Sequence, residues 1–134
     1  MSEVEEGSEL RLDFGKLRKV GETGQDVIPV VLQNADTGDV LYVAYVNEEA
    51  LRATIETNTA VLWSTSRNEL WHKGATSGDV LDLVDVRVNC EQNSVLYRVR
   101  PRGGVCHTKD ASGKTRPVCY YRKLDAQGNA LEPA

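Results

Sequence analysis

Residues 80–101, VLDLVDVRVNCEQNSVLYRVRP, contain two apolar runs separated by a short polar segment. In the first run, hydrophobic and charged residues alternate with a period of two, as in a strand that has one buried face. The second run, 94–101, can pair with the first through a tight turn at 91–93. These residues therefore predict an antiparallel β-hairpin. Its expected buried face is made of Val84, Val86, Val88 and, at the end of the strand, Cys90.

Four further segments have strand or helix patterns. VIPVVLQ (27–33) and DVLYVAYV (39–46) are apolar and β-branched, and the Asp-Thr-Gly turn between them predicts another hairpin. NEEALRATIETN (47–58) predicts a helix, because Asn47 can cap it and two glutamates favour its first turn. VLWSTS (61–66) predicts a strand. The order strand, strand, helix, strand, strand, strand indicates an α+β fold of mostly antiparallel β-sheet with one main helix.

The length of 134 residues is that of one domain. We expect this domain at 13–124, after a flexible acidic tail at 1–12 and before a short C-terminal tail at 125–134. No apolar run reaches the roughly 20 residues of a membrane span, and the N-terminus lacks the basic-then-apolar pattern of a secretory signal. The sequence therefore predicts a cytoplasmic protein without a membrane partner.

The chain has three cysteines, Cys90, Cys106 and Cys119. An odd number, without an export signal, argues against a disulfide framework and leaves metal binding, catalysis or burial as their use. Thiolates favour zinc, and three protein ligands leave the fourth tetrahedral position open to water, as in catalytic zinc sites. The spacing of the three cysteines is not that of a zinc finger. For a single cysteine such as Cys90, the alternative to a metal ligand is a small residue of the hydrophobic core.

His107 directly follows one of these cysteines in GVCHTKDASGKTRPVCYYR (104–122). An imidazole titrates near neutrality, so beside a metal-activated water it is a candidate general acid or base. The alternatives are a surface histidine in solvent and a fourth zinc ligand that would close a structural site. The other histidine, His72, is not expected to be catalytic.

The most unusual polar stretch is SRNELWHKGATSGD (66–79). It combines cations and hydroxyls with glycines, whose backbone N–H groups can approach an anion, and arginine can hold a phosphate through two donors. The alternative is a plain polar loop, with the tryptophans in the core. The residues expected to contact a flat, phosphorylated ligand are Trp63, Arg67, Trp71, Lys73, Thr76, Ser77 and Gly78. The residues alone therefore predict a zinc hydrolase of a phosphorylated small molecule.

A basic cluster lies mainly in the C-terminal third of the chain. It lacks interleaved aromatic side chains at its centre, so a small anionic ligand is favoured over nucleic acid. Its members are Arg98, Arg100, Arg102, Lys109, Lys114, Arg116, Arg122 and Lys123.

From about residue 13 to residue 123 these segments resemble the phosphoribosyl-AMP cyclohydrolase family of histidine biosynthesis. The matching pieces are VLYVAYVNEEAL (40–51), VLWSTSRNELWHKGATSGD (61–79), the strand that ends in Cys90, and GVCHT followed by CYYR. The resemblance implies hydrolytic opening of the adenine ring of 1-(5-phosphoribosyl)-AMP at the N1–C6 bond. It also implies a homodimer whose two subunits share each active site, with His107 near the metal and the 66–78 segment holding the substrate. The zinc ligands that it implies are Cys90, Cys106 and Cys119.

The chain also departs from the family pattern. The family usually surrounds the first cysteine with three aspartates that bind magnesium, whereas the corresponding residues here are Asn89, Glu91 and Asn93. One carboxylate remains, so the sequence predicts a magnesium site that is weakened or lost. The gap between Cys106 and Cys119 is longer than usual, which lengthens a loop without requiring the ligands to move.

Two other interpretations remain open. A paralogue could use the same zinc chemistry on another purine-like nucleotide, or the zinc could stabilise a dimeric module that is not catalytic. A structural site needs four protein ligands, whereas a catalytic site needs an open position. The WHKGATSG loop favours substrate binding, because a structural zinc has no need of it.

Overall fold

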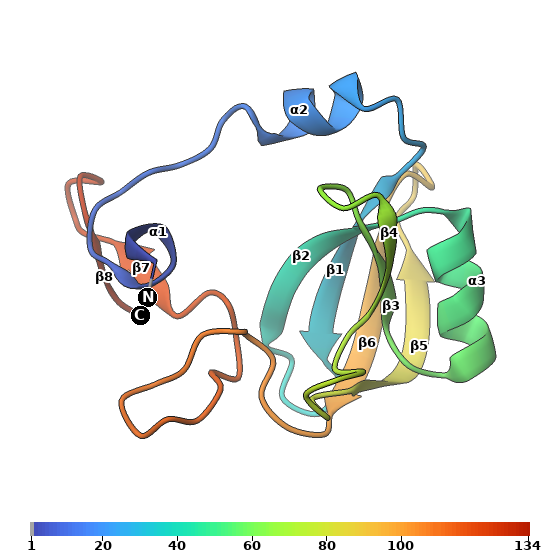
Figure 1. The fold of residues 1–134 in the computed structure, drawn as a ribbon. Helices are drawn as coiled ribbons and strands as arrows, with labels where there is room; N and C mark the ends of the chain where they lie inside the picture. Colours follow the sequence, from blue (N-terminus) through green and yellow to red (C-terminus); the bar gives the residue numbers. More distant parts are fainter. Residues whose placement is uncertain (1) are drawn as a thin grey trace.

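The computed structural model describes residues 2–134, and its largest sheet, which we call the central sheet, has four strands (Figure 1). The strand order is β2-β1-β6-β5. β1 and β6 run parallel, while β1–β2 and β5–β6 are antiparallel. Both predicted hairpins and the predicted α+β class are therefore confirmed. The four strands are β1 (Ile28–Asn34), β2 (Val40–Val46), β5 (Leu81–Val88) and β6 (Val95–Pro101).

Local chemistry explains the turn between β1 and β2. The side-chain oxygen of Asn34 accepts hydrogen bonds from the backbone N–H groups of Asp36 and Thr37, at 2.9 and 3.1 Å. Gly38 has a φ of 82°, a left-handed conformation that glycine adopts without steric cost. The Asx turn and the glycine together reverse the chain and set the start of β2.

One face of the sheet is covered by a helix and a second hairpin. The helix α3 (Glu48–Thr57) begins at Asn47, whose side chain accepts a hydrogen bond from the backbone N–H of Ala50 at 2.8 Å, as predicted. β3 (Val61–Ser64) pairs with β4 (Glu69–His72). β4 was not predicted, because the polar segment that contains it has only two apolar residues in its four strand positions. The core lies between these elements and the sheet, and its largest fully buried side chains are Leu32, Leu41, Leu62, Leu81 and Tyr97.

A β-bulge interrupts the alternation of β5. The register shifts between Leu83 and Asp85, after which Val86 lies opposite Tyr97 of β6. The strand ends at Val88, which is 57% exposed because it lies beyond the edge of the core. Cys90 follows in the turn and is exposed. Val84 is also exposed, so the expectation that Val84, Val88 and Cys90 lie on a buried face is wrong.

The two ends of the chain lie together, away from the central sheet (Figure 1). The short helix α1 (Glu3–Glu6) lies near the hairpin formed by β7 (Arg122–Leu124) and β8 (Leu131–Pro133), and Glu9 forms a β-bridge with Ala130. A second short helix, α2 (Lys16–Glu22), leads into β1. The division into two terminal tails and a domain at 13–124 stays a prediction. Among residues 2–134, no helix is both long and apolar enough to cross a membrane.

The hydroxyl of Thr54 joins the helix, the second hairpin and the sheet. It lies 2.8 Å from the carbonyl oxygen of Ala50 and 3.2 Å from the hydroxyl of Tyr97, and it accepts a hydrogen bond from the backbone N–H of Val61 at 3.0 Å. Thr54→Val keeps the shape of the side chain but leaves these buried groups without a partner. We expect the free energy of unfolding to fall by about 2 kcal/mol in a denaturant titration.

Thr57→Val is the matched control for this prediction. Thr57 lies on the same helix and its hydroxyl also bonds to a carbonyl one turn earlier, but the residue is exposed, so water replaces the lost bond. We expect a change of no more than about 0.5 kcal/mol. Equal effects of the two substitutions would contradict the structural role given to Thr54.

Candidate active site

The loop between Cys106 and Cys119 folds back on itself. The backbone N–H of Cys106 donates to the carbonyl oxygen of Arg116 at 2.9 Å, and that of Arg116 donates to the carbonyl of Thr108 at 3.1 Å. A turn over residues 110–113 closes the loop. Because its two arms are bonded to each other, the extra length projects outward and leaves both cysteines at its base.

The two thiols at this base are adjacent. Cys106 is buried, and its sulfur lies 3.0 Å from the hydroxyl of Thr108. Cys119 is half-buried, and its backbone N–H donates to the carbonyl of Leu41 at 2.8 Å. Burial, followed by the charge and the hydrogen bond of the Cys106 side chain, raises the pKa of Cys119 to about 12. Cys119 is therefore a protonated, desolvated thiol in the absence of metal, and a soft cation would replace its proton.

Cys90 lies apart from this pair. Nowhere in residues 2–134 does the structure bring three metal-ligating side chains together. Of the three predicted zinc ligands, a single chain thus brings two close together and leaves the third exposed in the turn after β5.

Cys106 lines a cavity of about 610 Å³ that we call the basic cavity. It brings five of the predicted substrate-binding residues together with Cys106 and His107. His72, at the end of β4, also lines it. The residues that define the basic cavity here are Arg67, Trp71, Lys73, Thr76, Ser77, Cys106, His107, Lys109 and Thr115. Two carboxylates, Asp79 and Glu69, also line it, and Glu69 lies 3.5 Å from the guanidinium of Arg67.

Two glycines allow the chain to pack tightly beside this cavity. Gly74 has a φ of 81°, and a Cβ there would lie 2.2 Å from the carbonyl carbon of Asp79. A Cβ at Gly103 would lie 2.4 Å from the Asp79 side chain. The predicted residue Gly78 donates from its backbone N–H to the carbonyl of Gly74 at 2.8 Å and closes the turn that carries Thr76 and Ser77. Gly74 and Gly103 therefore let the turn and the cysteine loop meet around Asp79.

The positive charges that the sequence grouped into one cluster are mostly neutralised. Within residues 2–134, no ion pair forms at Lys73, Lys109 or Lys114, and of these three only Lys73 and Lys109 line the basic cavity. Burial lowers the pKa of the half-buried Lys73, against the opposing effect of Asp79 and the two thiols. The paired members are Arg98 with Asp85 (2.9 Å), Arg100 with Asp36 (3.1 Å), Arg102 with Asp82 (2.7 Å), Arg116 with Glu6 (3.5 Å) and Lys123 with Glu132 (3.8 Å), while Arg122 donates to the carbonyls of Val4 and Gly7.

A second cavity of about 410 Å³ adjoins the first, and its lining is mostly apolar and includes the aromatic side chains of Tyr42, Trp71 and Tyr120. The two cavities share Trp71, Lys73 and His107. The ring of Trp71 lies 6.5 Å from that of Tyr42, with 37° between their planes, so the two rings form part of an apolar wall. We call this the aromatic cavity, and its lining includes Tyr42, Trp71, Lys73, His107, Cys119 and Tyr120.

His107 and Trp63 differ in their relation to these cavities. His107 is exposed at their boundary, and its Nε2 contacts the carboxylate of Glu5. Trp63 lies outside both cavities, and its indole N–H donates to the side chain of Gln25. The pairing of β3 with β4 explains this: Trp63 lies opposite Leu70 and Trp71 opposite Leu62, which puts the two tryptophans on opposite faces of the hairpin.

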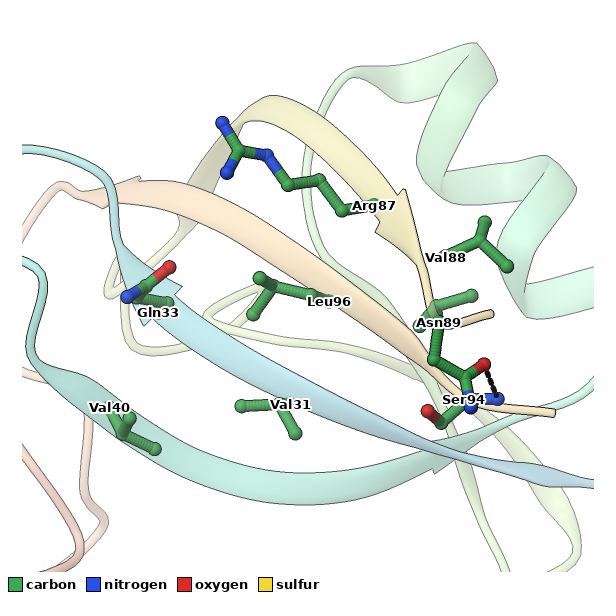
Figure 2. A pocket seen from close by; sticks show the side chains of 9 residues that line it. Val31, Gln33, Val40, Arg87, Val88, Asn89, Ser94 and Leu96 are labelled. Carbon is green, nitrogen blue, oxygen red and sulfur yellow. Dashed lines mark hydrogen bonds between the residues drawn. The ribbon is translucent and has the colours of Figure 1, made fainter. Parts of the chain in front are cut away.

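The three positions where the family carries magnesium-binding aspartates are bonded to one another. The side-chain N–H of Asn89 donates to the side-chain oxygen of Asn93 at 2.6 Å, and the amide of Asn93 donates to Glu91 at 3.1 Å. The oxygen of Asn89 accepts from the backbone N–H groups of Asn93 and Ser94, both at 3.0 Å. Figure 2 shows the bond with Ser94. Magnesium needs several free oxygen ligands. These residues therefore do not fit a magnesium ion, and the loop is held by hydrogen bonds alone.

Several lining residues carried no specific prediction, among them Tyr42 and Lys109. Tyr42 belongs to an apolar strand pattern, in which nothing distinguishes a tyrosine at a cavity wall from one in the core. Lys109 was one of eight basic residues, and only the fold of the cysteine loop separates it from its paired neighbours.

Comparison with known proteins identifies the family. A model of the phosphoribosyl-AMP cyclohydrolase family matches residues 42–121, a range that holds the three cysteines and His107. The phosphoribosyl-AMP cyclohydrolase of Haloarcula marismortui is 50% identical over 77% of this chain and 81% of its own length. The enzyme of the same name from Methanothermobacter thermautotrophicus is 49% identical over 76% of this chain and 70% of its own length. The one from Caulobacter vibrioides is 48% identical over 74% of this chain and 68% of its own length. The chain therefore belongs to the phosphoribosyl-AMP cyclohydrolase family, a family of hydrolases.

Proposed function

We propose that this protein opens the adenine ring of 1-(5-phosphoribosyl)-AMP by hydrolysis of the N1–C6 bond, a step of histidine biosynthesis, and that the reaction depends on zinc. One observation carries the proposal. Two adjacent thiols and a histidine lie where a basic cavity meets an aromatic one, which suits a substrate that combines phosphate groups with a flat heterocycle.

Zinc fits the donor set of the site. Cys106 and Cys119 supply two soft ligands in contact, and the exposed Cys90 is free to supply a third to another chain. We propose a homodimer in which each zinc is held by Cys106 and Cys119 of one subunit and by the Cys90 residue of the other. The fourth position would then stay open, which distinguishes a catalytic from a structural site.

The uncovered face of the central sheet supports a dimer. A shallow cavity of about 390 Å³ lies on this side, lined by residues of all four strands, among them Val31, Val40 and Leu96 (Figure 2). Val40 and Val43 are 46% and 49% exposed in the single chain. Apolar side chains gathered on one face are typical of a protein–protein contact. Asn89 lines the same cavity, so a second copy seated here would approach the turn that carries Cys90.

In the proposed reaction the basic cavity and the aromatic cavity bind different parts of the substrate. The basic cavity holds the phosphate groups through Arg67, Lys73 and Lys109, and the aromatic cavity holds the adenine ring against Trp71. Zinc, when bound, lowers the pKa of a water molecule and so supplies a nucleophile near neutral pH. In the proposed hydrolysis the oxygen of a water molecule would add to C6, one of its protons would go to the exocyclic nitrogen, and the other would go to N1 as the N1–C6 bond breaks. His107, at the boundary of the cavities, is placed to deliver that proton.

The test is an absorbance assay of phosphoribosyl-AMP ring opening by protein that has been stripped of metal. Zinc is titrated in, with and without millimolar magnesium. We expect zinc alone to restore full activity, because the Asn89, Glu91 and Asn93 loop has its own hydrogen bonds and no need of a hard cation. Activity should saturate at about one zinc per chain.

Two results would contradict this. An absolute requirement for magnesium would mean that the amide oxygens of the loop do bind a hard cation. Tight zinc binding without any turnover would favour a different nucleotide substrate or a structural zinc. As a direct measurement, the paramagnetic ion Mn²⁺ should show no tight binding to the zinc-loaded protein, whereas the variant Asn89→Asp with Asn93→Asp should gain it.

A further inference from the structure

Tyr42 carries a buried hydroxyl that the fold leaves without a partner. Within residues 2–134 two buried side-chain oxygens lack a hydrogen bond, the Tyr42 hydroxyl and one oxygen of Asp85. The Asp85 oxygen lies 3.6 Å from the guanidinium of Arg87, which compensates its charge. Tyr42 has no such neighbour. Because a buried polar group without a partner destabilises the folded state, its presence needs a reason.

The surroundings of Tyr42 point to Cys119. Tyr42 is 8% exposed and lines the aromatic cavity with Cys119. The residue before it, Leu41, accepts the backbone hydrogen bond of Cys119 at 2.8 Å, so strand β2 runs directly beside the cysteine. A phenol carries a proton at neutral pH, so the Tyr42 hydroxyl is available as a donor.

We infer that the Tyr42 hydroxyl donates a hydrogen bond to the sulfur of Cys119 when that sulfur binds zinc as a thiolate. The inference rests on the proposed function, because it needs zinc at Cys119. A thiol is a weak acceptor, whereas a thiolate carries the charge that makes a hydrogen bond strong. Tyr42 is thus a positioning residue, which orients a metal ligand and moderates its charge as outer groups do in other metal sites. Its unpaired state belongs to the metal-free protein.

The variant Tyr42→Phe removes only the hydroxyl oxygen. Zinc affinity is measured by competition with a chromophoric chelator, and the sulfur-to-metal charge-transfer band is recorded after substitution with Co²⁺. We expect zinc to bind about 10- to 100-fold more weakly and the band to shift. In the absence of metal, the variant should unfold at the same denaturant concentration as the wild type or a higher one, because the hydroxyl that it loses makes no bond there.

Tyr97→Phe is the matched control. Tyr97 is also a buried tyrosine, but its hydroxyl lies 3.2 Å from that of Thr54, and it lines neither cavity. This variant should lower the stability of the metal-free protein and leave zinc affinity and the cobalt spectrum unchanged. The two substitutions thus have opposite effects on the two measurements.

The outcomes separate this inference from the proposed function. If the wild type binds zinc through its cysteines and Tyr42→Phe binds it equally tightly with the same cobalt spectrum, the inference is overturned and the proposed function stands. A metal-free Tyr42→Phe protein that is less stable than the wild type would also overturn it, since the hydroxyl would then have a partner inside the fold. Failure of the wild type to bind zinc would overturn both.

Discussion

Cys106→Ala is expected to release the zinc and to reduce ring opening by at least about a thousandfold. Cys106 is the buried member of the thiol pair, and Cys119 beside it loses its partner when that sulfur is removed. Each proposed site would then keep only two cysteine ligands, Cys119 and the Cys90 residue of the other subunit, which is one fewer than the three protein ligands of an open tetrahedral zinc site. Zinc content by atomic absorption and initial rates at saturating zinc are the two measurements.

Two further variants separate loss of zinc from loss of proton transfer and from a general effect of changing this loop. His107→Ala alters the next residue and should lower turnover about 10²- to 10⁴-fold while zinc stays bound, because His107 is proposed to move a proton. Lys114→Ala changes an exposed residue of the same loop that lines neither cavity, and it should keep both zinc and activity. Cys106→Ala protein that is folded by circular dichroism, active and fully loaded with zinc would exclude Cys106 as a ligand.

The elements that could be predicted are those determined by residues close to them in the sequence. The cap at Asn47 and the turn that Gly38 completes act locally, so α3 and the first hairpin follow from the sequence alone. The bulge after Leu83 depends instead on how β5 meets β6, and no local pattern reveals it. For the same reason the parallel pairing of β1 with β6 was not predictable, since the two strands are about 65 residues apart.

The candidate site shows the same division. The cysteines and the Trp-His-Lys-Gly-Ala-Thr-Ser-Gly loop are recognisable as chemistry, because their residue types are unusual together. Which of them meet depends on the tertiary fold. Trp63 and Trp71 looked equivalent in the sequence, but strand parity separates them. Cys90 likewise looked like the partner of Cys106 and Cys119, yet within one chain it lies apart from them.

Because Cys90 lies apart from Cys106 and Cys119 within one chain, we predict that two inactive variants regain activity when they are mixed. Cys90→Ser and Cys106→Ser should each be inactive as homodimers, because every shared site would lack one zinc ligand. When the two proteins are unfolded and refolded together, half of the dimers are mixed. In a mixed dimer one site combines Cys90 of one chain with Cys106 and Cys119 of the other and is intact, while the second site lacks two ligands.

We therefore expect the mixture to regain about one quarter of the wild-type activity, since half of the dimers have one working site out of two. Zinc bound per chain should rise with the activity. A mixture of Cys106→Ser with Cys119→Ser is the control and should stay inactive, because both residues belong to the same half of the site and no combination of chains restores it. Recovery in the control, or none in the first mixture, would mean that Cys90 is not a ligand shared between subunits. The exposed position of Cys90 would then need another explanation, and the zinc would have to be held by Cys106 and Cys119 with a ligand from their own chain.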